Sequence, residues 1–418
     1  MINTICVDVA VIGAGPAGLA AGISAKHHGA KNVIILDRNG WLGGILPQCI
    51  HDGFGVIETG SSLTGPEYAK KYIDMVEQED ICIMRETMVL ELNDDKKILA
   101  VNKKGLHQIQ AGSIILAMGC REKTRWNAMI PGSRPSGIYT AGVAQAFINL
   151  YNIMPGKNVI ILGSGDVGLI IARRLKFEGA NVLGVVEILP YASGLPRNVV
   201  QCLDDYDIPI FLNHTITCID GKERITHVTI AQVDDHINPI AGTEKKIPCD
   251  TLLLSLGLIP ENELSKHAGI KIDSVTGGPF VNERLETTLD GVFACGNCLQ
   301  VYDTVDMLSM DAKRAGKNAA EKAEFQEDKH RSMIRINAGK GVSYVVPQCI
   351  EKPGLVPFTF RSVKPQQNCI LTVETNKEIL LRKKMRWVNP ANMVRFEVEI
   401  SEEIIALNQE IKVSIDDT

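Results

Sequence analysis

One sequence pattern occurs twice in this chain and constrains its fold more than any other feature. Residues 9–37 read VAVIGAGPAGLAAGISAKHHGAKNVIILD, and residues 159–187 read VIILGSGDVGLIIARRLKFEGANVLGVVE. Each copy consists of an apolar strand, a G-x-G-x-x-G turn, a helix that ends near a glycine, a second apolar strand and an acid. The interval from the third glycine to the acid is the same in both copies, which end at Asp37 and Glu187. A single match would be weak, whereas two matches in register predict two dinucleotide-binding folds.

The three glycines of each copy have separate roles in such a site. The first allows the tight turn out of the strand, the second lets the backbone approach a pyrophosphate, and the third lets the helix pack close to the strand. The pyrophosphate then lies at a helix N-terminus, which favours negative charge. Asp37 and Glu187 are placed to accept hydrogen bonds from a ribose diol. The predicted binding glycines are Gly13, Gly15 and Gly18 in the first copy and Gly163, Gly165 and Gly168 in the second. The alternative is a glycine-rich turn without a ligand.

The two copies also continue alike. Residues 81–110 predict a β-meander that leads into GSIILAMGCRE, and residues 208–247 predict one that leads into CDTLLLSLGLIPE. Each half therefore ends in a buried apolar strand followed by a glycine, Gly119 or Gly257. This is the layout of the two-dinucleotide flavoprotein reductases, and most of the chain resembles the pyridine nucleotide-disulfide oxidoreductase superfamily. The resemblance implies FAD in the N-terminal fold and NAD(P) in the second.

These features predict an α/β protein with two Rossmann-like dinucleotide-binding folds, each with a β-meander insertion, and a small C-terminal β domain. We expect a discontinuous FAD-binding domain over residues 1–125 and 285–330 and an NAD-binding domain over 126–284. Residues 331–418 have no glycine fingerprint and contain short alternating segments, which predict a small antiparallel β domain. This tail could dock a partner subunit or mediate self-association.

The stretch FACGNCLQVYDTVD contains the only C-x-x-C spacing in the chain, at Cys295 and Cys298. By resemblance, the strand before it brings the chain back to the flavin, with Asn297 in place of the usual acid, and residues 302–322 form a helix that points at the flavin. The two cysteines then lie on a turn next to the flavin and are not a redox dithiol. The resemblance implies further FAD contacts at Arg38, Gly44, Gly119, Asn297 and Asp303, and an NAD contact at Gly257.

Disulfide reductases carry a cysteine pair next to the flavin or in the NADPH domain. Here the Gly43-Gly44 loop is followed by a single cysteine, Cys49, and the second fold contains no C-x-x-C, so disulfide reduction is not expected. Cys49 and His51 are candidate catalytic residues, because such a pair could tune the flavin, act as acid or base, or hold an adduct. Alternatively, Cys49 is a small packed side chain and His51 hydrogen-bonds a loop carbonyl.

Several longer stretches, including GGILPQCIHDGFG, AMGCREKTR and LGSGDVGLIIARRL, resemble the FAD/NAD oxidoreductase associated with anaerobic-type glycerol-3-phosphate oxidase. More distantly, the chain resembles dinucleotide-binding subunits of sarcosine oxidase, dye-linked proline dehydrogenase, opine oxidase and hydrogen cyanide synthase. The resemblance implies hydride transfer between NAD(H) and FAD, and electron exchange with a second flavoprotein that oxidises glycerol 3-phosphate or a similar metabolite. A stand-alone NADH oxidase and an electron-relay subunit whose dinucleotide does not turn over are the alternatives. NAD is favoured over NADP because Glu187 repels a 2′-phosphate and no arginine follows it at once.

Composition excludes some other functions. A net charge of −5 and a pI near 6.0 offer no electrostatic footprint for nucleic acid. No apolar stretch is long enough to span a membrane, which indicates a cytoplasmic protein. A metal centre is not expected, because the single C-x-x-C has no second pair of ligands. Of eleven cysteines, Cys6, Cys82 and Cys218 lie in apolar runs that predict buried thiols.

Overall fold

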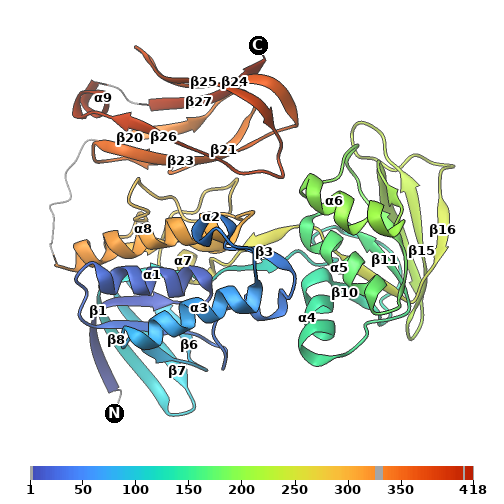
Figure 1. Cartoon of the computed structure of the whole chain (residues 1–418), viewed down its shortest axis with the longest axis horizontal. Helices are drawn as coiled ribbons and strands as arrows, with labels where there is room; N and C mark the ends of the chain where they lie inside the picture. The colour runs from blue at the N-terminus through green and yellow to red at the C-terminus, as the bar shows by residue number, and fades with distance from the viewer. Residues whose placement is uncertain (1–2, 325–332, 408–409, 418) are drawn as a thin grey trace. The chain divides into compact units, whose positions relative to one another are not determined.

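The computed structural model describes residues 3–324, 333–407 and 410–417. The chain forms two compact units, one of Met1–Cys120 with Pro260–Thr418 and one of Arg121–Ile259 (Figure 1). The second unit ends at residue 259, whereas the sequence placed the boundary at 284. Asn262 accounts for the earlier limit, because its side chain donates to the carbonyl oxygens of Cys298 and Gly277 at 2.6 and 2.9 Å.

The first unit is built around a seven-stranded sheet in the order β5-β2-β1-β8-β7-β6, with β19 also paired to β8. Its strands are β1 (Asn3–Ile12), β2 (Val33–Leu36), β5 (Cys82–Met84), β6 (Met88–Leu92), β7 (Lys97–Asn102), β8 (Gly105–Leu116) and β19 (Val292–Ala294). β1 pairs in parallel with β2 and β8. Parallel strands covered on both faces need continuous apolar runs, and all of β2 is buried. This confirms a nucleotide-binding fold in the N-terminal half.

One strand of this sheet serves both the meander and the parallel fold. β8 pairs in an antiparallel manner with β7 and in parallel with β1. The last strand of the predicted meander and the predicted buried strand are therefore one continuous strand, β8. Because β8 ends at Leu116, its carboxyl end delivers the following residues to the same edge as the glycine turn after β1.

Two helices cover the sheet next to this edge, α1 (Pro16–His27) and α8 (Val305–Glu324). They pack so closely that a Cβ at Gly316 would lie 2.1 Å from the carbonyl oxygen of Ala21. The sequence predicted the second helix over 302–322, but it begins later, because the backbone N–H of Tyr302 donates to the Asn297 side chain at 3.1 Å. A further helix, α3 (Gly65–Gln78), starts with a capping box.

The second unit contains a five-stranded parallel sheet in the order β10-β17-β11-β12-β13. Its strands are β10 (Ile138–Thr140), β11 (Asn158–Leu162), β12 (Asn181–Val186), β13 (Ile210–Phe211) and β17 (Thr251–Leu254). The insertion is an antiparallel sheet of β14 (His214–Gly221), β15 (Ile225–Gln232) and β16 (Lys245–Pro248). The helices are α4 (Ala141–Tyr151), α5 (Asp166–Phe177) and α6 (Pro196–Cys202). The second nucleotide-binding fold is therefore confirmed.

The tail forms the β-rich part that the sequence predicted, in two sheets of order β22-β20-β27-β24-β25 and β21-β23-β26. The strands are β20 (Ile334–Ala338), β21 (Val342–Val346), β22 (Cys349–Ile350), β23 (Gly354–Ser362), β24 (Gln366–Thr375), β25 (Ile379–Val388), β26 (Val394–Ile400) and β27 (Glu410–Asp417), with α9 (Glu402–Leu407). Phe358 stacks on Phe396 in its core with ring centroids 5.2 Å apart. The prediction of a purely antiparallel domain was wrong in one place, because β20 and β27 pair in parallel.

The tail is joined to α8 by buried charges. Asp311, whose side chain is 2% exposed, accepts hydrogen bonds from Arg395 of β26 at 2.8 Å and from the hydroxyl of Tyr302 at 2.6 Å. Asp303 pairs with Arg361 of β23 and accepts a hydrogen bond from the backbone N–H of Met393. These contacts tie the β-rich tail to the helix that follows the FACGNC stretch.

The expected burial of three thiols was wrong. Cys6 and Cys82 are exposed and Cys218 is half-buried. Cys6 lies in the first half of β1, where exposed and partly buried residues alternate, and β5, which carries Cys82, is an edge strand. Around these three cysteines, an apolar stretch of sequence was therefore buried on one face of the sheet at most.

The remaining short elements link these parts. They are η1 (Leu46–Gln48), β3 (Asp52–Phe54), α2 (Val56–Thr59), β4 (Leu63–Thr64), β9 (Cys120–Glu122), η2 (Asp204–Tyr206), β18 (Leu258–Pro260), α7 (Glu263–His267) and η3 (Gly296–Cys298).

Candidate dinucleotide sites

The first glycine turn closes tightly between β1 and α1. Gly13 has φ +108°, and a Cβ there would lie 2.4 Å from the carbonyl oxygen of Ala117. A Cβ at Gly18 would lie 1.7 Å from the carbonyl oxygen of Gly13. Gly15 is the N-cap of α1, and no side chain caps that end. The backbone N–H groups at this helix start are the kind that bind a pyrophosphate.

Asp37 lies under this turn. Its carboxylate accepts hydrogen bonds from the backbone nitrogens of Ala14 at 2.6 Å and Asn39 at 2.8 Å. Asp37 is buried, and the neighbouring Arg38 is exposed. The acid therefore holds the glycine turn in place, and the ionised carboxylate still has acceptor capacity for a ribose diol.

The Gly43-Gly44 loop lies against the same turn. The backbone N–H of Gly43 donates to the carbonyl oxygen of Ala14 at 2.8 Å, and a Cβ at Gly44 would come within 2.9 Å of the Cα of Gly15. The backbones of Gly15 and Gly44, which carry no side chains, are thus close together where a dinucleotide would bind. This cradle fits the FAD that the sequence assigned to the first fold.

Cys49 and His51 follow this loop. The Cys49 thiol donates to the carbonyl oxygen of Ile45 at 3.5 Å, and burial raises its pKa to about 12. Nδ1 of His51 lies 3.0 Å from the carbonyl oxygen of Asp52, and its ring packs 5.0 Å from that of Phe54. A thiol with this pKa is protonated near neutral pH and is a poor nucleophile.

The FACGNC stretch lies next to the first glycine turn and to α1. Phe293 of β19 is in register with Ile115 of β8, and a Cβ at Gly296 would lie 2.6 Å from that of Ala17 in α1. The Asn297 amide donates to the sulfur of Cys120 at 3.6 Å. Gly119, one residue earlier, has no heavy atom within 4 Å of the place of a Cβ.

The two cysteines of this stretch are structural. Both are fully buried, and burial raises the pKa of Cys295 and brings that of Cys298 to about 11. The Cys298 thiol lies 3.2 Å from the carbonyl oxygens of both Leu116 and Cys295. They therefore lack the thiolate character of a redox pair.

Sequence reasoning missed the residues that hold the segment after His51. The Asp306 carboxylate accepts hydrogen bonds from the backbone nitrogens of Gly55, Ile57 and Glu58 at 3.2, 3.1 and 2.9 Å. Glu58 accepts hydrogen bonds from Lys313 at 2.6 Å and from the hydroxyls of Tyr68 and Tyr72, both at 2.7 Å. The helix-compatible pattern of residues 302–322 did not reveal these contacts. Asp303, a predicted FAD contact, is engaged with Arg361, so its FAD role stays a prediction.

The second glycine turn has the same construction in its own unit. A Cβ at Gly163 would lie 2.1 Å from the carbonyl oxygen of Ser255, and one at Gly168 would lie 2.7 Å from its Cβ. Gly165 is the N-cap of α5. Ser255 also accepts a hydrogen bond from the backbone N–H of Gly168 at 3.1 Å, which fixes the turn to the end of β17. The backbone around Gly257 is open, as it is at Gly119.

Glu187 lies beneath this second turn and is more completely engaged than Asp37. It accepts hydrogen bonds from the backbone nitrogens of Ser164 and Leu189 at 2.9 and 3.0 Å. The hydroxyls of Ser164 and Ser193 also donate to it, the latter at 3.1 Å. The two serines were missed from the sequence, although comparison of the copies places Ser164 opposite Ala14 and could have singled it out.

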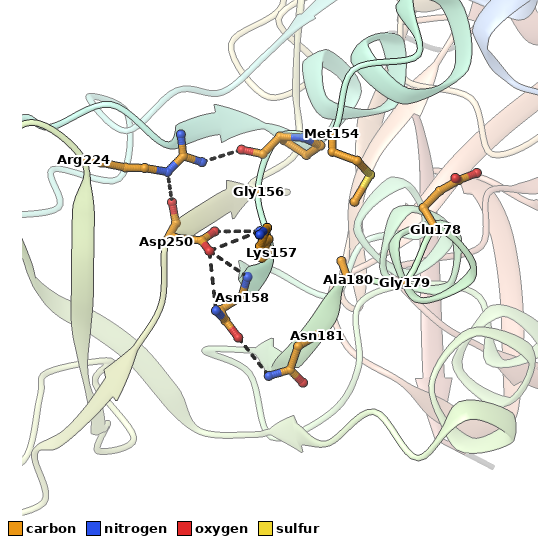
Figure 2. A pocket seen from close by; sticks show the side chains of 11 residues that line it. Met154, Gly156, Lys157, Asn158, Glu178, Gly179, Ala180, Asn181, Arg224 and Asp250 are labelled. Atoms are coloured by element: carbon orange, nitrogen blue, oxygen red, sulfur yellow. Dashed lines mark hydrogen bonds between the residues drawn. The ribbon is translucent and has the colours of Figure 1, made fainter.

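A pocket of about 790 Å³ opens at the opposite end of the second unit (Figure 2). It is lined at the amino ends of β11 and β12, by Asn158 and Asn181 among others. The Asp250 carboxylate accepts hydrogen bonds from the backbone N–H groups of Lys157 and Asn158 at 2.9 and 3.0 Å. Figure 2 draws these contacts as dashed lines. Ligands of parallel sheets bind at the carboxyl ends of the strands, so this pocket is not a dinucleotide site.

Comparison with known proteins now identifies the family. The model of the pyridine nucleotide-disulphide oxidoreductases matches residues 7–319. The chain belongs to this family. FAD and NAD(P), the two cofactors predicted from the sequence, are the cofactors of this family.

Three curated relatives match 62–79% of the chain. The chain is 25% identical to a hydrogen cyanide synthase subunit, HcnB, of Pseudomonas protegens, covering 62% of this chain and 58% of that protein. It is 24% identical to an opine oxidase subunit of Agrobacterium tumefaciens, covering 69% and 61%. It is 26% identical to an NADH oxidase of Methanocaldococcus jannaschii, covering 79% and 73%. The first two matches thus span about three fifths of those relatives.

The fold is shared with solved structures. Thioredoxin reductase of T. acidophilum superposes with a TM-score of 0.64 at 22% identity, covering 77% of this chain and 99% of that one. L-proline dehydrogenase of P. horikoshii superposes with a TM-score of 0.54 at 19% identity, covering 78% and 58%. Within the described ranges, no helix has the length and apolar character needed to cross a membrane.

Proposed function

We propose that this flavoenzyme transfers a hydride between NAD(H) and FAD and exchanges electrons with a partner flavoprotein that oxidises glycerol 3-phosphate or a similar small metabolite. The observation that carries the hydride-transfer part is the duplicated site: two tight glycine turns, each at the N-terminus of a helix and each with a buried acid under it. Bound FAD would accept the hydride and release electrons to the next carrier. The chain itself supplies binding, orientation and a fixed polar environment.

The first fold holds FAD in this proposal. The glycine turn binds the pyrophosphate, Asp37 accepts the ribose diol, and the Gly44 backbone lies beside the turn. Gly119 and Asn297 follow the carboxyl ends of the paired strands β8 and β19, and exposed Arg38 flanks the acid. The N-terminus of α8 would stabilise negative charge on reduced flavin.

The second fold holds NAD(H). Its binding residues are Gly163, Gly165, Gly168, Glu187 and Gly257, by position in the duplicated fold. Glu187 disfavours a 2′-phosphate, and the adjacent residues 188–194 contain no arginine. NAD(H) is therefore proposed over NADP(H), and a comparable hydride rate with NADPH would contradict the choice.

Dithiol chemistry is not part of the proposal. Cys49 has a pKa of about 12, and Cys295 and Cys298 are buried with raised pKa values. Among the described cysteines none is in a disulfide. The raised pKa of Cys49 favours the interpretation of this residue as a packed side chain.

A multi-subunit assembly is supported by the names of two relatives, which are subunits of opine oxidase and hydrogen cyanide synthase. On this chain we propose the tail as the docking surface. Its edge strand β25 exposes Arg382, Lys383, Lys384 and Arg386. Self-association through the same strand is the alternative. Replacing Arg382, Lys384 and Arg386 with Glu should separate a co-purified partner flavoprotein. A chain that stays monomeric before and after this change would exclude self-association.

Anaerobic stopped-flow mixing with NADH tests the central reaction. We expect NADH to bleach the flavin absorbance of the purified chain. NADH that binds without bleaching the flavin would contradict the proposal and favour the electron-relay role.

A stand-alone NADH oxidase is the second candidate, favoured by the M. jannaschii relative, which carries that name and is matched over 79% of this chain. Oxygen uptake equal to NADH consumption, without any partner, would support it. Co-purification of a second flavoprotein with glycerol-3-phosphate dehydrogenase activity would support the partner model.

A further inference from the structure

We infer that Ser164 and Ser193 control nucleotide recognition in the second fold, because their hydroxyls donate to Oε2 of Glu187, one of the two oxygens to which a ribose diol would bind. The inference rests on the proposed function, since it concerns the site assigned there to NAD(H). It adds two binding determinants to the glycines and the acid of the pattern.

One of the two carboxylate oxygens of Glu187 is fully engaged. Each oxygen of an ionised carboxylate offers about two lone-pair positions. Oε2 accepts hydrogen bonds from the backbone nitrogen of Ser164 and from the hydroxyls of Ser164 and Ser193, whereas Oε1 accepts one from the backbone nitrogen of Leu189. Glu187 is also only 3% exposed. A ribose diol that binds both carboxylate oxygens must therefore replace a donor that is already in place on Oε2.

The first fold provides an internal comparison. Asp37 receives hydrogen bonds from the backbone nitrogens of Ala14 and Asn39, which occupy the same places in the pattern as Ser164 and Leu189. The backbone donors are thus common to both folds. The second fold adds the two hydroxyls, and alanine at position 14 has none.

The segment that carries Ser193 is held against the turn. The backbone N–H of Ser193 donates to Oγ of Ser164 at 2.8 Å, and that of Leu195 donates to Asp166 at 2.8 Å. The Asn198 side chain donates to the same Asp166 oxygen at 2.7 Å. A Cβ at Gly194 would lie 2.8 Å from the carbonyl oxygen of Ser164. The backbone contacts of residues 193–195 and the Asn198 side chain therefore hold Ser193 in place, independently of the Ser193 hydroxyl.

The exchange is selective by chemistry. Backbone N–H groups are fixed by the fold, whereas hydroxyl groups rotate. A ribose diol has two O–H donors, of which one can donate to Oε1 and the other can replace a serine hydroxyl on Oε2. A 2′-phosphate lacks that donor and brings negative charge to a buried carboxylate. The serines therefore compete with NAD(H) for Glu187 but cannot be replaced in this way by NADP(H).

Binding constants of the flavin-loaded protein test the inference. We expect Ser193→Ala and Ser164→Ala each to bind ADP-ribose and NADH about three- to ten-fold more tightly, because one internal competitor of ordinary hydrogen-bond strength is removed. The Kd for NADPH should not fall, so selectivity for NADH rises. Ser193→Thr keeps a hydroxyl and should bind like the wild type. Ser136→Ala is the matched control, because its hydroxyl donates to the Glu223 carbonyl at 2.7 Å.

Two results would overturn the inference and are distinguishable. Unchanged or weaker NADH binding in both alanine variants, with flavin bleaching by NADH intact in the wild type, overturns the inference alone. If neither the wild type nor the variants bind ADP-ribose and NADH does not bleach the flavin, the inference fails together with the proposed function. A merely structural role for the serines would lower the affinity for both nucleotides.

Discussion

The carboxylate of Asp306, in the first turn of α8, accepts a hydrogen bond from the backbone nitrogen of Glu58 at 2.9 Å and so caps α2. The two residues are far apart in sequence. This contact places the segment that follows Cys49 and His51 against the helix that follows the FACGNC stretch.

Removing this cap should loosen the segment. Asp306→Asn replaces one carboxylate oxygen with an NH2 group, which cannot accept hydrogen bonds from the backbone N–H groups of α2. We expect the free energy of unfolding to fall by about 1–3 kcal/mol. The flavin content after purification should also fall. Thermal unfolding and the ratio of flavin to protein absorbance measure both effects. An unchanged melting temperature would show that Asp306 does not hold α2.

Glu58 gives a pH-dependent prediction. Burial disfavours its charged form, but hydrogen bonds from Lys313, Tyr68 and Tyr72 outweigh burial and lower its pKa from 4.5 to about 2. A carboxyl whose pKa is lower in the folded state stabilises the protein above the unfolded pKa and loses this effect as pH falls toward the folded value. Glu58→Gln should therefore lower the melting temperature at pH 7, and the difference should shrink below about pH 4.5. Exposed Glu91→Gln is the control.

Cys49 and His51 can be tested by turnover. Because burial raises the pKa of Cys49 to about 12, we expect Cys49→Ser with His51→Ala to leave NADH-to-dye turnover within about two-fold of the wild type. Iodoacetamide should label exposed Cys6 before Cys49, as mass spectrometry can record. A turnover loss of about a hundred-fold would instead show that Cys49 or His51 acts as an acid, a base or a nucleophile in catalysis.

Cys298 should be dispensable for cofactor binding. Cys298→Ala removes a buried sulfur next to two carbonyl oxygens and should cost about 1 kcal/mol through a small cavity. Flavin content and the rate of bleaching by NADH should remain nearly unchanged. A large loss of flavin would mean that the thiol itself contributes to the site.

The charge cluster around Asp311 should matter more for stability. Asp311→Ala leaves Arg395 and Arg314 without their buried partner and should cost about 3–5 kcal/mol. Lys340→Ala removes an exposed pair with Asp416 and should cost less than about 1 kcal/mol. Melting temperatures of the two variants compare these costs. Equal effects would contradict the role of burial.

The parts of the fold that depend on local spacing could be predicted from the sequence. Gly13 and Gly163 mark turns that no other residue permits, and the acids follow at a fixed interval. The partners of Asp303 could not be predicted, because Arg361 and Met393 lie in the β-rich tail. Ser193 was also missed, since a serine in a loop carries no signal until the fold brings it to Glu187.

The contacts from Asp303 and Asp311 to the tail limit how its function can be studied. A shortened chain that stops at the end of α8 would leave both carboxylates without their arginine partners in the tail. Loss of partner binding in such a fragment would not separate a missing docking surface from a damaged flavin fold. Charge substitutions on β25 avoid this confusion, because they leave the ion pairs of Asp303 and Asp311 with the tail intact.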